Sequence, residues 1–105
     1  MDELLQIMQE LTLPFAYHHF AEGESPEPPF VVYLIPGNNN FAADGIAYYK
    51  INEVHIELYT DKKDLQLEAQ VEAVLDQHGI FYDKTETWIE SEKLYEVPFI
   101  FDMEA

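Results

Sequence analysis

The chain has 105 residues, which is enough for one compact domain, residues 1–105, and too few for two. A hydrophobic fraction of 48% and an aromatic fraction of 14% supply a core, which excludes disorder of the whole chain. Its 21 acidic residues, five lysines and no arginine give a formal net charge of −16, which excludes binding to a nucleic-acid backbone or to an anionic membrane surface.

The first half of the chain predicts one helix and two strands. An amphipathic helix is expected over residues 2–11, because apolar residues recur there at i, i+3 and i+4. Residues 15–20 predict a short strand, followed by a surface loop rich in proline and glutamate. The continuous apolar run over 30–35 predicts a strand buried on both faces. Residues 36–46 show no periodicity, and we expect a long, mobile loop there.

The clearest strand of the chain lies over residues 48–60. Val54, Ile56 and Leu58 alternate there with polar residues, so one face of the strand is apolar and the other is polar. A helix is predicted over 65–78, and the strand and helix together predict an α+β domain.

The ends of that helix and the two strands after it also have sequence signals. Asp64 is a candidate N-cap, and Gly79 follows as a C′ residue. Two more strands are predicted at 80–91 and 93–103. Pro98 cannot donate a ladder hydrogen bond, so we expect it at a sheet edge or a bulge.

No pattern in the chain indicates catalysis, and we expect no catalytic residue, no cofactor, no metal and no enzyme activity. On a strand, His18 and His19 would point to opposite faces and could not bind one metal together. His55 lies between Glu53 and Glu57 on one strand face, which is a weak metal pattern that solvated strands also show. The chain has no cysteine, nucleophile-elbow serine or phosphate-binding glycine pattern.

The chain resembles a family of small proteins encoded in the head-to-tail morphogenesis clusters of tailed phages and prophages of Gram-positive bacteria. These are the tail terminator, or tail completion, proteins. The resemblance begins near Phe15 and covers nearly the whole chain. Its most distinctive parts are the acidic loop over 22–29, the loop after Pro36, and the segment KINEVHIELYTDKKD, residues 50–64. It implies an antiparallel sheet of four to five strands with two helices packed on one face.

The resemblance also implies a structural role. Such subunits form a ring, usually hexameric, that caps the tail tube and docks the DNA-filled head. The expected partners are further copies of the chain, the tail tube protein and a head-completion or connector protein. DNA would pass through the lumen, and an acidic lumen would repel its phosphates without binding a specific sequence. The expected locations are the host cytoplasm during assembly and then the neck or tail of the virion, with no membrane contact.

Two surfaces are candidate interfaces under this reading. The first is the loop over 36–46, which we expect to become ordered on assembly. The second is the polar side of the clearest strand, which would face a neighbour, the lumen or solvent. The candidate contacts are Asn38, Asn39, Phe41 and Asp44 in the loop, and Glu53, His55, Glu57 and Tyr59 on the strand.

Other functions fit the composition as well. The chain could be a different neck or connector component of similar size. It could instead be a small acidic inhibitor that mimics DNA and occupies the basic cleft of a host nucleic-acid enzyme. A small metal-dependent or hydrolytic enzyme would require a bound ion or a pocket with shifted pKa values. Solubility alone is a further reading of the charge.

Overall fold

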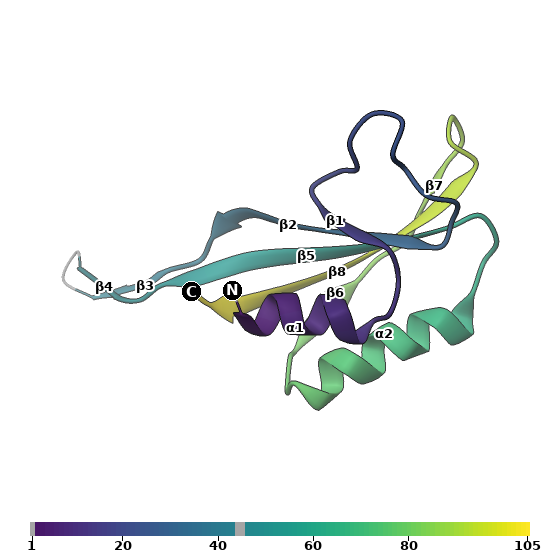
Figure 1. The fold of residues 1–105 in the computed structure, drawn as a ribbon. Coiled ribbons are helices and arrows are strands. Elements are labelled where there is room, and N and C mark those ends of the chain that lie inside the picture. Colours follow the sequence, from purple (N-terminus) through teal and green to yellow (C-terminus); the bar gives the residue numbers. More distant parts are fainter. Residues whose placement is uncertain (1, 44–45) are drawn as a thin grey trace.

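The computed structural model describes residues 2–43 and 46–105, and the side chains of 3–40 and 50–105. It contains two helices, a six-stranded mixed sheet and a separate two-stranded sheet (Figure 1). The elements are α1 (Asp2–Glu10), β1 (Phe15–Tyr17), β2 (Phe30–Asn38), β3 (Phe41–Ala43), β4 (Ile46–Tyr49), β5 (Ile51–Thr60), α2 (Leu65–Gln77), β6 (Tyr82–Lys84), β7 (Thr87–Ile89) and β8 (Leu94–Glu104).

The larger sheet has the strand order β1-β2-β5-β8-β6, and β7 pairs with another part of β8. Only the short β1 runs parallel to its neighbour, β2, among the strands paired in this sheet. The predicted α+β class and mostly antiparallel sheet are therefore confirmed. The sheet has six strands instead of four to five, because the segment predicted as one strand at 80–91 forms both β6 and β7.

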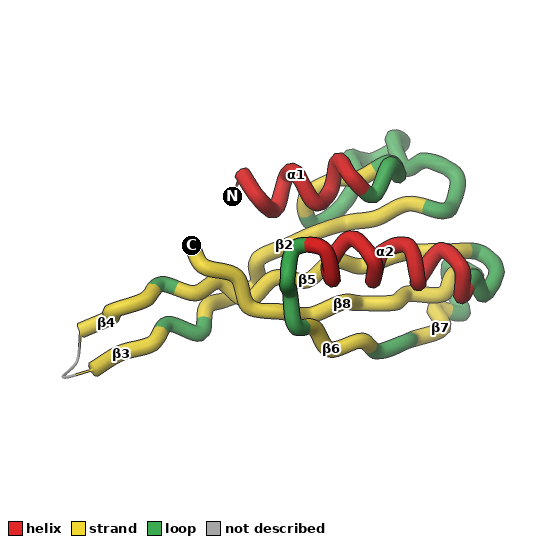
Figure 2. Tube along the Cα trace, turned by 90° about the horizontal axis from the view of Figure 1, so that it is seen from below, coloured by secondary structure: helices red, strands yellow, loops and turns green. Residues whose placement is uncertain are grey.

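Both helices pack on one face of this sheet (Figures 1 and 2). The alternation in β5 explains how, because Val54, Ile56 and Leu58 are almost completely buried between the sheet and the helices. α1 contributes the buried Leu4, Ile7, Met8 and Leu11, and α2 contributes Val71 and Leu75. The opposite side of the sheet carries no helix, and we call it the helix-free face.

The ends of α2 form as the sequence predicts. The carboxylate of Asp64 accepts a hydrogen bond from the backbone N–H of Leu67 at 2.9 Å. Gly79 adopts a φ of +69°, and the N–H of Ile80 bonds the carbonyl of Leu75 at 3.1 Å. This is a Schellman ending, which a residue with a Cβ would strain.

A buried carboxylate attaches α2 to β6. The side chain of Glu68 is 3% exposed, and its two oxygens lie 2.5 Å from Lys63 Nζ and 2.8 Å from Lys84 Nζ. Burial acts to raise the pKa of Glu68, but hydrogen bonds from both lysines outweigh it and lower the pKa. Two of the five lysines are therefore held against this acid on the helix side of the sheet.

Three predicted segments have different bounds or a different conformation in the structure. The strand expected over 15–20 ends at Tyr17, because His18 adopts a φ of +66°, which strand geometry does not allow. The expected loop over 36–46 contains strand residues: β2 continues to Asn38, and β3 begins at Phe41. The clearest predicted strand starts at Ile51, since residues 48 and 49 belong to β4.

Pro98 explains why the strand predicted at 80–91 is broken. It lies inside β8, opposite Glu57 of β5, so it is not at a sheet edge. Its carbonyl accepts a hydrogen bond from the N–H of Thr85 at 3.2 Å, which places the missing N–H of the proline on the same side of β8. On that side β6 ends at Lys84 and β7 starts at Thr87, so the partner strand is interrupted where no hydrogen bond can be donated to it.

Candidate functional site

β3 and β4 form a hairpin that projects beyond the end of the larger sheet (Figures 1 and 2). We call residues 41–49 the hairpin arm. Its two strands pair with each other, with Phe41 opposite Tyr49, in a sheet of their own. The sequence between Pro28 and Tyr49 contains one charged residue, Asp44, although the chain as a whole carries a net charge of −16. The arm is therefore an almost uncharged extension of a strongly acidic body.

Asparagine side chains build the base of this arm. The N–H of Asn39 bonds the carbonyl of Ile51 at 2.9 Å, and the side-chain oxygen of Asn40 accepts a hydrogen bond from the N–H of Ile51 at 2.9 Å. The side-chain amide of Asn39 donates to Asp102 Oδ1 at 2.8 Å. These contacts satisfy backbone groups at the point where the chain leaves one sheet and enters the other.

The predicted loop residues thus have different positions. Asn38 is the last residue of β2 and lies opposite Asn52 of β5. Asn39 forms the arm base. Phe41 is the first residue of β3, but its side chain lies outside the described part of the structure, as does the whole of Asp44.

The predicted strand residues form one row on the helix-free face. They are half-buried and alternate with the core residues of β5, as the period of two requires; the row consists of Glu53, His55, Glu57 and Tyr59. His55 Nε2 lies 2.8 Å from Glu53 Oε2. Leu34 of β2 and Ile100 of β8 flank His55 on the neighbouring strands, so the row has an apolar residue on each side at this point.

Tyr59 connects two carboxylates across β5 and β8. Its hydroxyl lies 2.6 Å from Glu96 Oε2 and 3.1 Å from Glu57 Oε1. A phenol has one proton and donates to one acceptor at a time, and the shorter contact is the one to Glu96. Burial and the charge of Glu96 raise the pKa of Glu57. Burial and the hydrogen bond to Glu96 likewise raise the pKa of Tyr59.

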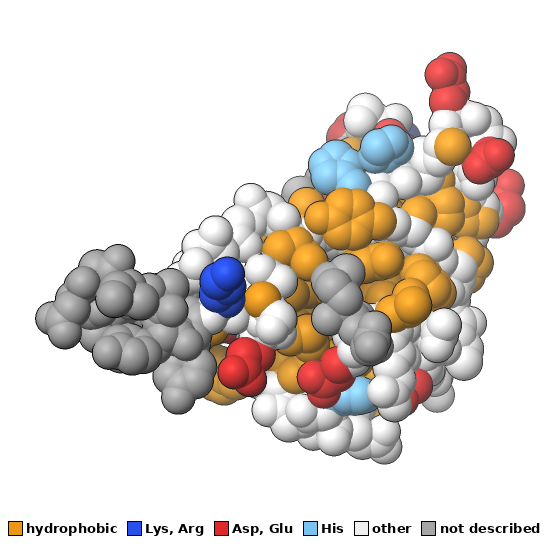
Figure 3. Space-filling view, turned by 60° about the vertical axis from the view of Figure 1, so that its left-hand side comes forward, with side chains coloured by type: hydrophobic (Ala, Val, Ile, Leu, Met, Phe, Trp, Pro, Cys, Tyr) orange, Lys and Arg blue, Asp and Glu red, His pale blue; other side chains and the backbone are white. Residues whose placement is uncertain are grey.

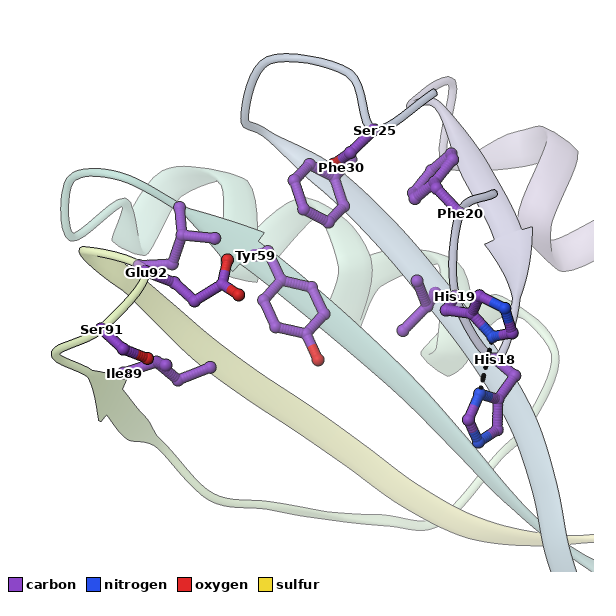
Figure 4. A pocket seen from close by; sticks show the side chains of 11 residues that line it. His18, His19, Phe20, Ser25, Phe30, Tyr59, Ile89, Ser91 and Glu92 are labelled. Carbon is purple, nitrogen blue, oxygen red and sulfur yellow. Dashed lines mark hydrogen bonds between the residues drawn. The ribbon is translucent and has the colours of Figure 1, made fainter. Parts of the chain in front are cut away.

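An aromatic pocket of about 310 Å³ opens on the helix-free face, at the end of the larger sheet that lies away from the hairpin arm (Figure 4). Phe30 of β2 lines it, stacked on Tyr59 at 5.2 Å and in edge contact with Phe20 at 5.3 Å. Leu94 and the turn before it form the opposite wall, and the exposed rim carries His18 and His19. Four separate segments build this pocket, so no local sequence pattern could have indicated it.

The two histidines differ from the prediction. They were expected on opposite strand faces, but the strand ends before them and their Nδ1 atoms lie 3.0 Å apart. The described residues contain no group of three or more His, Cys, Asp or Glu side chains that could hold a metal ion.

Ser25 and Ser91 also line the pocket. In the part of the chain that the structure describes, neither serine forms a hydrogen bond with a histidine.

A second apolar surface lies along the β1–β2 edge. Figure 3 shows hydrophobic side chains gathered beside a pair of histidines. On this edge Tyr33 contacts Tyr17 at a ring distance of 5.2 Å and Phe15 at 6.1 Å. The hydroxyl of Tyr17 accepts a hydrogen bond from the N–H of Ile35 at 3.1 Å, which occupies a backbone donor of β2.

No protein-family model matches the chain, and no curated protein matches it. Across residues 2–43 and 46–105, neither helix has the length and apolar character that a membrane crossing requires.

Proposed function

We propose that this protein is a structural subunit of a tailed-phage or prophage virion. In this role it is a tail terminator, or head–tail joining, protein that forms a ring, caps the tail tube and docks the head. The resemblance of the sequence to that family is one support. The hairpin arm is the observation that carries the proposal, because a projecting and almost uncharged hairpin is suited to contact with another chain.

The physical case starts from charge. Two copies of a chain with a net charge of −16 repel each other, and they approach most easily through surfaces without charge. The sequence of the hairpin arm is close to this, since Asp44 is its one charged residue. An isolated two-stranded hairpin is also marginally stable in water, so packing against a partner would stabilise it. Addition of salt weakens the repulsion and should promote assembly.

The helix-free face is the proposed lining of the lumen. Its row on β5 includes Glu53 and Glu57, and Glu96 and Asp102 lie beside them on β8. Carboxylates on a lumen wall repel phosphates, so DNA could pass without adhering. The tail tube protein and a head-completion or connector protein are the proposed partners at the two ends of the ring.

Negative-stain electron microscopy of the purified protein at high salt tests this function. The expected result is closed rings with an open lumen, and no retardation of DNA in a gel-shift assay. A matched variant replaces residues 41–49 with two glycines. The arm has its own sheet, so this variant should keep the body folded, with an unchanged circular dichroism spectrum, and should form no rings. If the variant formed as many rings as the parent protein, the arm would not be required for ring assembly.

A second candidate is the small acidic inhibitor that mimics DNA. The carboxylates of the helix-free face favour it, because Glu53, Glu57 and Asp102 provide several negative charges on one sheet surface. This reading requires a monomer that binds a basic host enzyme in a 1:1 complex. Oligomeric state therefore separates the two functions, and a pull-down against basic host proteins follows if only monomers are found.

A further inference from the structure

Phe81 is the most exposed large hydrophobic side chain in the described part of the chain, with 88% of its surface accessible. It lies between the C-terminal turn of α2 and β6. Its neighbours Ile80 and Tyr82 are half-buried against the core, and they fix the backbone so that Phe81 points outward. The exposure is thus imposed by packing on both sides. A phenyl ring held in water in this way is a candidate contact for a partner.

The aromatic pocket is a suitable receptor for such a ring. Its volume of about 310 Å³ exceeds the roughly 150 Å³ in which an engineered protein cavity binds benzene. The walls are the faces and edges of Phe20, Phe30 and Tyr59, and a further aromatic ring packs well against such edges and faces. The pocket is open to the outside, with the exposed residues His18, His19 and Ser91 among those that line it, so a side chain from another molecule can enter it.

Phe81 cannot reach this pocket within its own chain. Tyr82, the next residue, lies opposite Phe101, whereas the pocket residue Leu94 is at the other end of β8. At about 3.3 Å per residue, the seven steps along the strand from Leu94 to Phe101 span roughly 23 Å. A protruding group and its receptor at two different places make a head-to-tail contact, which generates closed rings or open filaments.

The end that carries Phe81 also carries the arm base, because Phe81, Asn39 and Asp102 line the same cavity of about 510 Å³. The two ends present different groups. Asp83 and Asp102 line the cavity beside Phe81, whereas His18, His19 and Glu92 line the pocket, which the acidic loop over 22–29 adjoins at Ser25. One end of the molecule therefore carries a protruding ring, and the other end carries a pocket that can receive it.

We infer that Phe81 of one copy inserts into the aromatic pocket of the next copy, and that this contact links neighbouring subunits of the ring proposed above. The occupant of the pocket is the phenyl ring of a second copy of the chain. The contact gives the assembly a direction, because each subunit uses its Phe81 end on one neighbour and its pocket on the other.

A pair of serine substitutions tests whether the Phe81 side chain strengthens self-association. F81S and L65S both remove an exposed large apolar side chain, since Leu65 is 68% exposed. Light scattering at high salt should show that F81S weakens self-association about tenfold or more, as loss of an interface anchor does. L65S should leave self-association unchanged. Neither side chain belongs to the core, so both variants should keep the circular dichroism spectrum of the parent protein.

Disulfide trapping tests the geometry, and the chain suits it because it has no cysteine. Ser91 is exposed and lines the pocket, so the F81C/S91C double variant should form disulfides between chains under mild oxidation. Non-reducing gels should show dimers and larger products. The control is L5C/S91C, in which Leu5 is 43% exposed on the helix side of the sheet. The two single variants control for random collision.

The outcomes separate this contact from the ring itself. Cross-linking of F81C/S91C above the level of the controls supports the contact. Cross-linking no greater than the controls overturns it, and rings that persist in F81S would show that the ring function stands without it. Cross-linked dimers that never close into rings would support the contact and reject the ring.

Discussion

Asn39 donates its side-chain amide to Asp102 Oδ1 over 2.8 Å, and this bond joins the base of the hairpin arm to the last strand of the chain. Together with the backbone bond from Asn39 to Ile51, it fixes the direction in which the arm leaves the body. Asn39 and Asn40, which lie in the segment predicted to be a loop, are thus structural supports of the arm.

Substitution of Asn39 by alanine should loosen the arm and leave the body intact. The lost hydrogen bond contributes about 0.5–1.5 kcal/mol to closure of the base. Backbone amides of residues 40–51 should therefore exchange with deuterium faster in N39A, while amides of the core strand β5 beyond Val54 keep their protection. N38A is the matched control, since it removes the neighbouring asparagine. Equal exchange of the arm in N39A and the parent protein would contradict this role.

Glu57 should make the protein less stable as the pH rises. Its pKa is raised in the folded state, so the folded protein holds the proton more tightly than the unfolded chain does. The stabilising contribution is present below the unfolded pKa of about 4.5 and is lost as the pH rises through the folded pKa. Glu96, His55, His18 and Tyr59 are the titratable groups that act on it.

E57Q mimics the protonated side chain and should be more stable than the parent protein at pH 7. The expected gain is a few tenths to about 1 kcal/mol, because Glu57 is half-exposed and solvent screens its charge. Urea unfolding followed by Trp88 fluorescence at pH 4.5 and pH 7 measures the difference, which should appear only at the higher pH. E53Q removes the same charge from the same face and serves as control. A destabilised E57Q at pH 7 would argue against this account.

Much of the sheet and core follows from local sequence patterns. The period of two in β5 correctly predicted which residues between Val54 and Tyr59 face the core, because burial of one face determines the register of a strand. The N-cap at Asp64 and the glycine ending at Gly79 were equally local signals. Such features need only a few consecutive residues, and the sequence displays them directly.

Other features depend on contacts that the sequence does not display. The arm was missed because residues 36–46 show no alternation, and a register shift interrupts both β2 and β3. The approach of His18 to His19 depends on a positive φ at a residue that usually avoids it. The aromatic pocket and the placement of Phe81 at the opposite end need the full topology, since β2, β5 and β8 meet there from distant parts of the chain.

His78 lies at the C-terminal end of α2 and should attach this helix to α1 in a pH-dependent way. Hydrogen bonds to Glu10 and Glu3, at 2.9 and 3.0 Å, raise the pKa of His78 above its ordinary value of about 6.5. The contribution to stability is fully present below the unfolded pKa, while the glutamates stay ionised. It is lost as the pH rises through the folded pKa of His78.

The parent protein should therefore exceed H78Q in stability at pH 6, and the difference should shrink by pH 9. Because the two carboxylates are well exposed to solvent, the difference at pH 6 should stay below about 1 kcal/mol. Thermal unfolding of both proteins across this pH range measures it. A difference between the two proteins that stays constant from pH 6 to pH 9 would exclude the ion pairs as its cause.

Glu68 should be the most important single ionic side chain for stability. Its carboxylate is buried between Lys63 and Lys84, and E68Q would leave both lysines without their shared partner. Breaking a buried ion pair costs about 3–5 kcal/mol, and the partly exposed lysines reduce this to about 2–3 kcal/mol here. E72Q, which changes an outer partner of Lys84, should cost less than about 1 kcal/mol in the same urea unfolding assay.

Acid should weaken this cluster as well. The pKa of Glu68 is lowered in the folded state, so its contribution is present above the unfolded pKa of about 4.5 and is lost as the pH falls through the folded pKa. The parent protein should therefore lose more stability than E68Q in this acid range. Equal acid sensitivity of the two proteins would show that other carboxylates control acid unfolding.

Light scattering across a salt series, with the parent protein beside the variant in which two glycines replace residues 41–49, tests the central claim most directly. The claim is that an almost uncharged arm assembles an acidic subunit into a ring. The parent mass should rise with salt from that of one 12.3 kDa chain to one discrete oligomer, and the variant should stay monomeric. A parent protein that stays monomeric at every salt and protein concentration, and does not differ from the variant, would contradict the claim.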